Sequence, residues 1–171
     1  SDSISQQRLK GLLNLIGPET NFDTEAGVLD SMQNALSDLV EWDAFVFVYF
    51  KPVEQKFEAF RVHNKTSFKY IWQRLQIYLS GTLVGKAILS GIPVKIDDTA
   101  ADSYKRFSKS EDLTFDGSFM AIPLMYGTQN FGVLCFESLK KNIYTNSDVK
   151  FLNNSVHIIS YIIYSHSSQT L

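Results

Sequence analysis

The segment from Asp43 to Phe50 constrains the fold of this chain more than any other. It reads Asp-Ala-Phe-Val-Phe-Val-Tyr-Phe, so every residue after the aspartate is apolar, and most of them are β-branched or aromatic. Such residues favour β-strands, and Pro52 ends the run because proline cannot continue a central strand. A short strand that is apolar on both faces is typical of the middle of a sheet covered by two layers. The run therefore predicts a central strand with packing on either side.

Hydrophobic spacing and turn residues divide the rest of the chain. We expect helices over residues 4–16, 24–40, 67–79, 82–91 and 148–165, with Gly91 ending the fourth and Thr145, Asn146 or Ser147 capping the last. We expect further strands over residues 57–62, 92–96, 118–126 and 130–137, the last two joined by the turn Gly127-Thr128-Gln129. The long polar segment 97–117 is expected to contain a helical turn or a lid. This order predicts an α+β fold built on an antiparallel sheet of five or six strands.

Charge and cysteine content exclude several classes of partner. The formal net charge of −2 supplies no basic field for nucleic acid or an anionic membrane. The longest apolar stretch, residues 44–50, is too short to cross a bilayer, so we expect no direct membrane insertion and a cytoplasmic location. The densest basic run, Tyr104 to Lys109, is followed by Glu111 and Asp112 and is interpreted as a solvated loop. The single cysteine, Cys135, excludes an internal disulfide and a cysteine-rich metal site.

The residues that enzymes need are scattered or missing. The sequence has no P-loop, no dinucleotide glycine pattern, no nucleophile elbow and no His-Glu-x-x-His. His157 and His166 are nine residues apart on the last predicted helix and do not share a face, so no metal site is expected. Asp97 and Asp98, with Asp102 nearby, either bind a cation or amine, or serve as a turn cap and a solvated carboxylate. We therefore expect that the chain is not an enzyme.

Several short sequence segments, in the order in which the family has them, resemble the GAF domain family of sensor and regulatory domains in bacterial-type signalling proteins. They are Leu83-Val84-Gly85-Lys86-Ala87, Gly91-Ile92-Pro93-Val94 with Asp97, Ser118 to Leu124, Gly132-Val133-Leu134, and Tyr144 with Asp148. The resemblance implies that residues 1–171 form one domain, with a linker or dimer helix over residues 1–17 and a core over residues 20–165. It also implies that the N- and C-terminal helices pack on one face of the sheet and that loops and a short helix cover the other.

The same resemblance implies several classes of ligand, and the residues of this sequence disfavour some of them. GAF domains bind cyclic nucleotides, bilins, haem, amino acids or other small molecules, and many have no known ligand. Of the cyclic-nucleotide motif only Asp148 is retained, and Cys135 lies in the last strand, away from where bilins attach. The free methionine sulfoxide reductases of this fold need an attacking and a resolving sulfur, which one cysteine cannot provide. The cofactor is therefore left unknown, with covalent bilin, haem and metal disfavoured.

The resemblance places a ligand between the sheet and the segment 97–117. Alternation along the central strand puts Phe45, Phe47 and Tyr49 on one face, and we assign this aromatic face to the ligand. The smaller face is assigned to the terminal helices. The expected ligand-binding residues are Phe45, Phe47, Arg61, Trp72, Asp97, Tyr104, Phe107, Phe115, Ser118, Phe119 and Glu137.

The last helix carries two apolar lines, and only one of them can pack on the sheet. The other needs a partner, so we expect a homodimer through the terminal helices. The expected interface residues are Leu9, Leu12, Ile16, Val156, Ile159 and Ile163. Since the chain begins with Ser1 and not with Met, we also expect it to be either an excised fragment of a larger protein or a processed chain. The predicted function is a non-catalytic, small-molecule-sensing regulatory domain of a signalling protein such as a histidine kinase or diguanylate cyclase. The alternative is a structural dimerisation module without a ligand.

Overall fold

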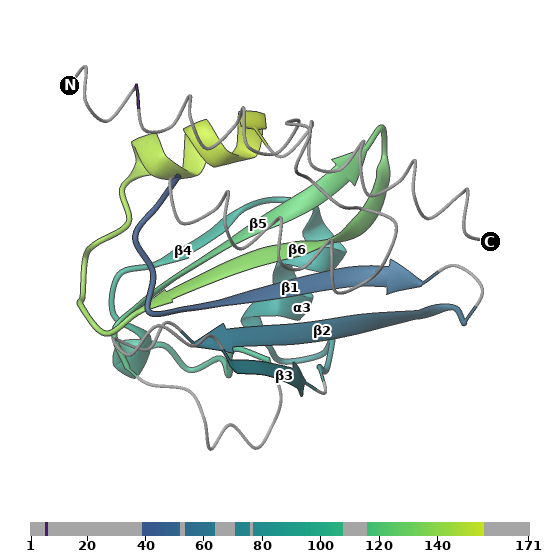
Figure 1. Ribbon diagram of the computed structural model, residues 1–171, viewed down its shortest axis with the longest axis horizontal. Helices are drawn as coiled ribbons and strands as arrows, with labels where there is room; N and C mark the ends of the chain where they lie inside the picture. The colour runs from purple at the N-terminus through teal and green to yellow at the C-terminus, as the bar shows by residue number, and fades with distance from the viewer. Residues whose placement is uncertain are drawn as a thin grey trace.

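An antiparallel sheet of six strands, in the order β3-β2-β1-β6-β5-β4, forms the centre of the molecule (Figure 1). The computed structural model describes residues 39–51, 54–63, 71–75, 77–107 and 116–155, together with Gln6. The strands are β1 (Ala44–Lys51), β2 (Lys56–His63), β3 (Ile71–Leu75), β4 (Val94–Ile96), β5 (Ser118–Tyr126) and β6 (Gln129–Ser138). The predicted α+β class and the antiparallel sheet of five or six strands are confirmed.

Strand β1 lies in the middle of the sheet, as its apolar run predicts. It pairs with β2 along its whole length, from Ala44 opposite His63 to Lys51 opposite Lys56. On its other side it pairs with β6, from Ala44 opposite Glu137 to Tyr49 opposite Gly132. Residues 44 to 48 are all exposed by 1% or less, so both faces of this strand are covered.

Two hydrophobic clusters lie on opposite faces of the sheet. One, here called the α3 face, joins the helix α3 (Leu83–Ser90) to alternate residues of the central strands, among them Val46, Val48, Phe119, Ala121, Val133 and Cys135. The other, here called the terminal face, joins the intervening strand residues to Leu39, Trp42, Tyr144 and Leu152. In Figure 1 α3 lies behind the sheet. The sheet is therefore the middle of three layers, and each strand contributes side chains to both outer contacts.

Helix α3 has the boundaries and caps that its sequence predicts. The Thr82 hydroxyl accepts a hydrogen bond from the Gly85 amide at 3.0 Å, which satisfies one of the free N–H groups of the first turn. At the other end Gly91 adopts φ +66° and donates its N–H to the Ala87 carbonyl. Glycine adopts this left-handed conformation without steric cost, which explains why the helix ends there.

The hairpin of β5 and β6 is also confirmed. Tyr126 pairs with Gln129, so that Gly127 and Thr128 form a two-residue turn. Gly127 has φ +62°, a value that tight hairpin turns require and that favours glycine.

The helix predicted over residues 67–79 is wrong where the structure describes it. Residues 71–75 form the strand β3, which pairs antiparallel with β2 from Ile71 opposite His63 to Leu75 opposite Ala59. The spacing of Trp72, Leu75 and Leu79 fits a helix face, but the strand gains backbone hydrogen bonds to β2. Tertiary pairing of this kind overrides local periodicity in short apolar segments.

The last helix begins with reciprocal capping. The Thr145 hydroxyl accepts from the Asp148 amide at 3.1 Å, and the Asp148 carboxylate accepts from the Thr145 amide at 2.9 Å. Residues 146–155 are helical, and Thr145 is thus the cap among the three candidates. The expected helices over residues 4–16 and 24–40 lie outside the described residues, apart from Gln6 and the end of the second. So do residues 156–165 and all six expected interface residues. No helix within the described ranges is long and apolar enough to cross a membrane.

Replacing Gly132 with alanine tests how tightly β6 lies against β1. A Cβ at this position would lie 1.8 Å from the Val48 carbonyl oxygen, so the central pairing must shift to accept it. We expect Gly132→Ala to lower the free energy of unfolding by about 3 kcal/mol or more, as backbone overlap in a core does. Denaturant unfolding measures the change.

Gly127→Ala is the matched control in the same hairpin. Gly127 also has positive φ, but no atom lies within 4 Å of where its Cβ would be. Only conformational strain is expected, at about 1 kcal/mol. Equal losses in the two variants would contradict the argument from close approach.

Candidate functional site

The aromatic face of β1 does not face α3, so this part of the sequence prediction is wrong. Phe45 and Phe47 belong to the terminal face, where the Phe45 ring meets that of Trp42 at 5.0 Å between centroids. The smaller Val46 and Val48 face α3 instead. The physical reason is the partner that the rings find on the terminal face, where Phe45 and Phe47 pack with Trp42, Tyr144 and Leu152 in one apolar cluster. Aromatic side chains gain from such ring contacts when they are buried together.

A short segment over residues 104–107, here called the strap, is bound to the start of α3. The amides of Leu83 and Val84 donate to the carbonyls of Lys105 and Arg106 at 2.8 and 3.0 Å. The Tyr78 amide donates to the Phe107 carbonyl at 2.8 Å. The first N–H groups of a helix have no hydrogen-bond acceptor within the helix. The strap carbonyls accept from two of them and so complete the hydrogen bonding of the first turn of α3.

Gly85 explains how the chain before α3 fits against the helix. A Cβ on Gly85 would lie 1.8 Å from the Leu79 carbonyl oxygen. The Thr82 hydroxyl also donates to the Tyr78 carbonyl, which closes the turn that leads into the helix. The segment over residues 78–82 is therefore held against α3 on one side and against the strap on the other.

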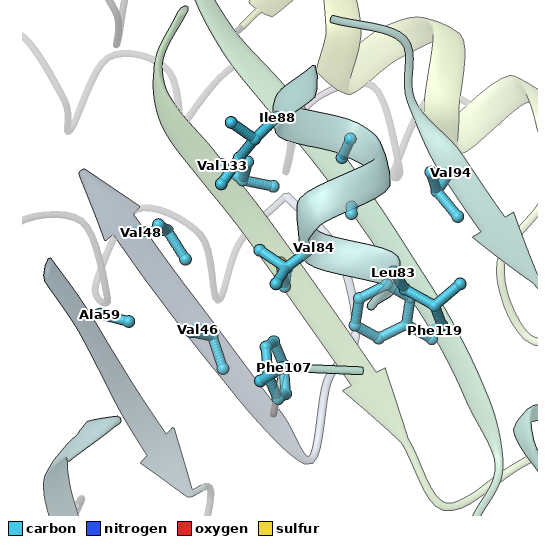
Figure 2. Packing of buried hydrophobic residues seen from close by; sticks show 13 residues of the cluster. Val46, Val48, Ala59, Leu83, Val84, Ile88, Val94, Phe107, Phe119 and Val133 are labelled. Atoms are coloured by element: carbon cyan, nitrogen blue, oxygen red, sulfur yellow. The ribbon is translucent and has the colours of Figure 1, made fainter. Parts of the chain in front are cut away.

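The strap places Phe107 beneath α3. Figure 2 shows its ring beside Val46 and Phe119 and below Val84. The Phe107 and Phe119 rings meet edge to face, with centroids 5.9 Å apart. Phe107 is only 2% exposed. Phe107 and Phe119, both expected at the site, are thus brought together on the α3 face.

A charged pair lies in the same layer. Arg106 Nε is 3.7 Å from Glu137 Oε1, and their side chains are only 10% and 1% exposed. Arg106 Nη2 is also 3.8 Å from the Asp116 carboxylate, which is exposed to solvent. Glu137 pairs in register with Phe119 and follows Cys135 by two residues, which puts its side chain on the α3 face. A buried carboxylate of this kind is stabilised by the nearby guanidinium.

Sequence reasoning missed Arg106, because the run Tyr104 to Lys109 was interpreted as a solvated loop. Lys105 is indeed exposed, but the Arg106 side chain turns inward. No signal within the segment marked Arg106 for burial, because, of its two aromatic residues, Tyr104 is 47% exposed and Phe107 only 2%. Residues 108–115, including the expected Phe115, lie outside the described part of the chain.

The aspartates of the segment 97–102 have local partners. Asp98 accepts from the Ala100 amide at 3.1 Å and so caps the short 3-10 helix η1 (Thr99–Ala101), the helical turn expected in this segment. Asp97 forms an ion pair with Lys95 at 2.7 Å. Asp102 accepts from the Tyr104 amide. Of the two alternatives, the structure supports turn caps and surface pairs, although the cap is Asp98 and not Asp97. Within the described ranges no three His, Cys, Asp or Glu side chains are arranged to hold a metal ion.

The remaining expected site residues are spread over the fold. Tyr104 is 47% exposed, with Lys86 Nζ 5.7 Å from its ring centre. Ser118 is buried and donates its hydroxyl to the Lys140 carbonyl, a contact that holds the chain after β6. Arg61 lies opposite Val46 in the sheet register, and Trp72 lies opposite Val62 on the edge strand.

Two buried groups have perturbed acidity. Burial, with a smaller contribution from the charge of Glu137, raises the pKa of the Cys135 thiol well above its usual value. Burial and the surrounding carboxylates, led by Asp43, raise the pKa of Tyr144, whose hydroxyl donates to the Glu41 carbonyl at 2.9 Å. Both groups therefore stay protonated at neutral pH.

Comparison with known proteins identifies the family. The sequence profile of the GAF domain matches residues 23–163. The chain belongs to the GAF domain family. No curated protein sequence is similar enough to this GAF domain to count as a match.

Solved structures share the fold at low sequence identity. The GAF domain of a phosphoenolpyruvate-protein phosphotransferase from Acinetobacter has a TM-score of 0.69 and 16% identity, covering 96% of this chain and 98% of its own. The GAF domain of a two-component sensor histidine kinase from Bacillus halodurans has a TM-score of 0.63 and 18% identity, covering 86% and 99%. A free methionine-R-sulfoxide reductase from Neisseria meningitidis, solved with its substrate, has a TM-score of 0.66 and 16% identity, covering 100% and 95%. At these identities the likeness establishes the fold alone.

A double-mutant cycle measures the energy of the buried pair. We expect Arg106→Met and Glu137→Leu each to cost about 3 kcal/mol, because each removes the opposite charge nearest to a buried charged group. The double variant should cost clearly less than the sum, since it leaves neither charge behind. Urea unfolding of the four proteins gives the coupling energy.

The exposed pair Lys140–Glu41 serves as the control. Its atoms are closer, at 3.1 Å, but the side chains are 71% and 65% exposed. Water screens such a pair, so the same cycle should give a coupling of at most about 1 kcal/mol. A coupling at Arg106–Glu137 no larger than this would contradict a stabilising role for the buried pair.

Proposed function

We propose that this GAF domain is a non-catalytic, small-molecule-sensing regulatory domain of a larger signal-transduction protein, such as a histidine kinase or a diguanylate cyclase. The observation that carries the proposal is the Arg106–Glu137 pair in the apolar α3 face. Ligand sites are lined mainly by apolar side chains, with a few placed polar groups that fix orientation. An ion pair in the layer of a short helix, together with the edge-to-face rings of Phe107 and Phe119, matches that description.

The state of the only cysteine supports a non-catalytic role. Thiol chemistry requires a thiolate that can reach its substrate. Cys135 is fully buried in β6, and its pKa is raised by burial. The chain shares its fold with a methionine sulfoxide reductase. Its one cysteine, however, offers no accessible thiolate for such chemistry.

The signalling role draws support from the architecture and the relatives. A GAF domain of a sensor histidine kinase and one of a phosphotransferase share the fold. The terminal face packs on the helix over residues 146–155 through Leu152. In the proposed role a change on the α3 face biases the terminal helices, which act on an output domain in the cytoplasm.

A structural dimerisation module without a ligand is the second candidate, and the packing of the α3 face favours it. The side chains of Val46, Val84 and Phe119 are fully buried, and Phe107 fills the space between them. A face that its own side chains fill needs no ligand for stability.

Thermal-shift screening of amino acids, organic acids and nucleotides distinguishes the two candidates. For a sensor, at least one compound should raise the melting temperature, because it binds the native state alone. The rise should be lost in Glu137→Gln. It should persist in Glu58→Gln, which alters a carboxylate of β2 that is also buried and pairs with Lys56 at 3.3 Å. If a compound raises the melting temperature of Glu137→Gln as much as that of the wild type, its binding site lies elsewhere. If no compound raises the melting temperature of the wild type, the structural module is favoured.

We also propose that the domain is a homodimer through its terminal helices, on the sequence pattern of the last helix. The double variant Ile159→Asp with Ile163→Asp places two charges on the expected interface, so the mass measured by light scattering should fall to that of a monomer. Ser160→Asp adds a charge to the same helix away from that line and should leave the mass unchanged. A wild-type monomer at high concentration would rule out this dimer.

A further inference from the structure

Large apolar side chains stay exposed on the outer surface of the α3 layer. Within the described ranges six such side chains are exposed, and five of them belong to α3, to the turns on either side of it or to the strap: Tyr78, Leu79, Leu89, Ile92 and Tyr104. Leu89 and Ile92 are the most exposed of the five, at 71% and 64%. Single exposed apolar residues are ordinary, but several on one face of a domain mark a contact surface.

These side chains lie beside one another along the helix. Leu89 is on the outward side of α3, one turn after Gly85, and the Leu79 carbonyl lies against Gly85. Lys86 is one turn before Leu89, and its Nζ lies 5.7 Å from the Tyr104 ring centre. Leu79 and Tyr104 therefore border Leu89 on its two sides. The outer patch is defined here as Leu79, Lys86, Leu89, Ile92, Tyr104 and Lys105.

The outer patch carries positive charge in a chain whose formal net charge is −2. Lys86 and Lys105 are exposed, and no carboxylate of the described residues forms an ion pair with either. Asp102 and Asp116 contact the strap, but they bind the Tyr104 amide and Arg106. Most other lysines of the described ranges do have a carboxylate partner, namely Lys51, Lys56, Lys95, Lys140 and Lys141. The patch is thus complementary to a partner that is both apolar and acidic.

We propose that the outer patch binds an acidic amphipathic helix of a partner protein. The backbone groups of this layer are already bonded: the first amides of α3 donate to the strap, and the Asn130 side chain donates to the Ile88 carbonyl at 3.0 Å. A partner cannot add a strand to such a surface. A helix satisfies its own backbone groups and needs only a stripe of side chains to pack on. Its apolar stripe packs on Leu89, and its carboxylates pair with Lys86 and Lys105.

Two other occupants fit the patch less well. A second copy of this chain would bring the lysines of the two patches toward one another, and like charges oppose such a contact. An anionic membrane attracts each lysine only weakly, and two lysines with a few half-exposed apolar side chains do not anchor a domain.

Two synthetic helices of about 18 residues, long enough to hold helical structure, test the proposal on the full chain. Both carry leucines at three- and four-residue spacing, and the flanking positions are glutamate in one and lysine in the other. We expect the glutamate helix to bind with a Kd of about 0.1 mM or lower, and the lysine helix at least about tenfold more weakly. A nuclear magnetic resonance titration measures both affinities and should show shifts at the Lys86 and Leu89 amides. No binding of the glutamate helix at about 1 mM, or equal affinity for the two, would overturn the proposal.

Exposed substitutions on and off the patch locate the binding. Leu89→Gln should weaken binding of the glutamate helix about tenfold, because it removes the centre of the patch. Leu139→Gln is the matched control, since Leu139 is 61% exposed after the end of β6, and it should leave the affinity unchanged. Lys86→Glu should weaken binding at least about threefold, whereas Lys150→Glu on the last helix should not. Thermal melting checks that all four variants are folded. Binding that neither patch variant weakens would contradict the assigned surface.

The other occupants are outcomes of the same experiments. A wild-type dimer in sedimentation that is lost in Leu89→Gln would replace the partner helix with a second copy. Binding to vesicles of phosphatidylcholine and phosphatidylserine that depends on Leu89 would replace it with a membrane. Neither result bears on a ligand beneath α3 or on the terminal helices, so this inference is tested separately from the proposed function.

Discussion

The pairing of β1 with β2 on one side and β6 on the other is the contact on which the rest of the structure depends. It runs through residues that are buried on both faces, so it fixes where each neighbouring layer can pack. Because side chains alternate along a strand, this register also decides which residues of β6 meet α3 and which meet the terminal face. Gly132 lies on this pairing, where a side chain would meet the Val48 carbonyl.

The two faces of the sheet differ in the size of the side chains that β1 contributes to them. On the α3 face β1 contributes Val46 and Val48. On the terminal face it contributes the rings of Phe45 and Phe47 and the partly buried Tyr49. On the α3 face the strap also meets the first turn of α3, where its carbonyls complete the helix hydrogen bonding. The position of Arg106 beside Glu137 follows from this sequence of contacts.

Local chemistry made much of the fold predictable from the sequence. The apolar run of β1, the glycine that ends α3 and the turn at Gly127 each have one physical interpretation, and each was confirmed. Predictions failed where a distant partner decides the outcome. Ile71–Leu75 became a strand because β2 offers an edge, and the aromatic face of β1 lies opposite to its predicted side because its rings pack with Trp42 on the terminal face. Arg106 was missed for the same reason: nothing within its own segment shows that Glu137 lies beneath it.

Strand β6 also connects the buried pair to the chain that leaves the sheet. Glu137 faces α3, while its neighbour Phe136 packs on the terminal face with Tyr144 and Leu152. The backbone of Glu137 accepts from the Asp43 amide at 2.8 Å, and the Asp43 carboxylate accepts from the Leu139 amide at 2.8 Å. These hydrogen bonds hold this end of β6 against β1. Two consecutive residues of one strand thus join the buried ion pair on the α3 face to the packing of the terminal face.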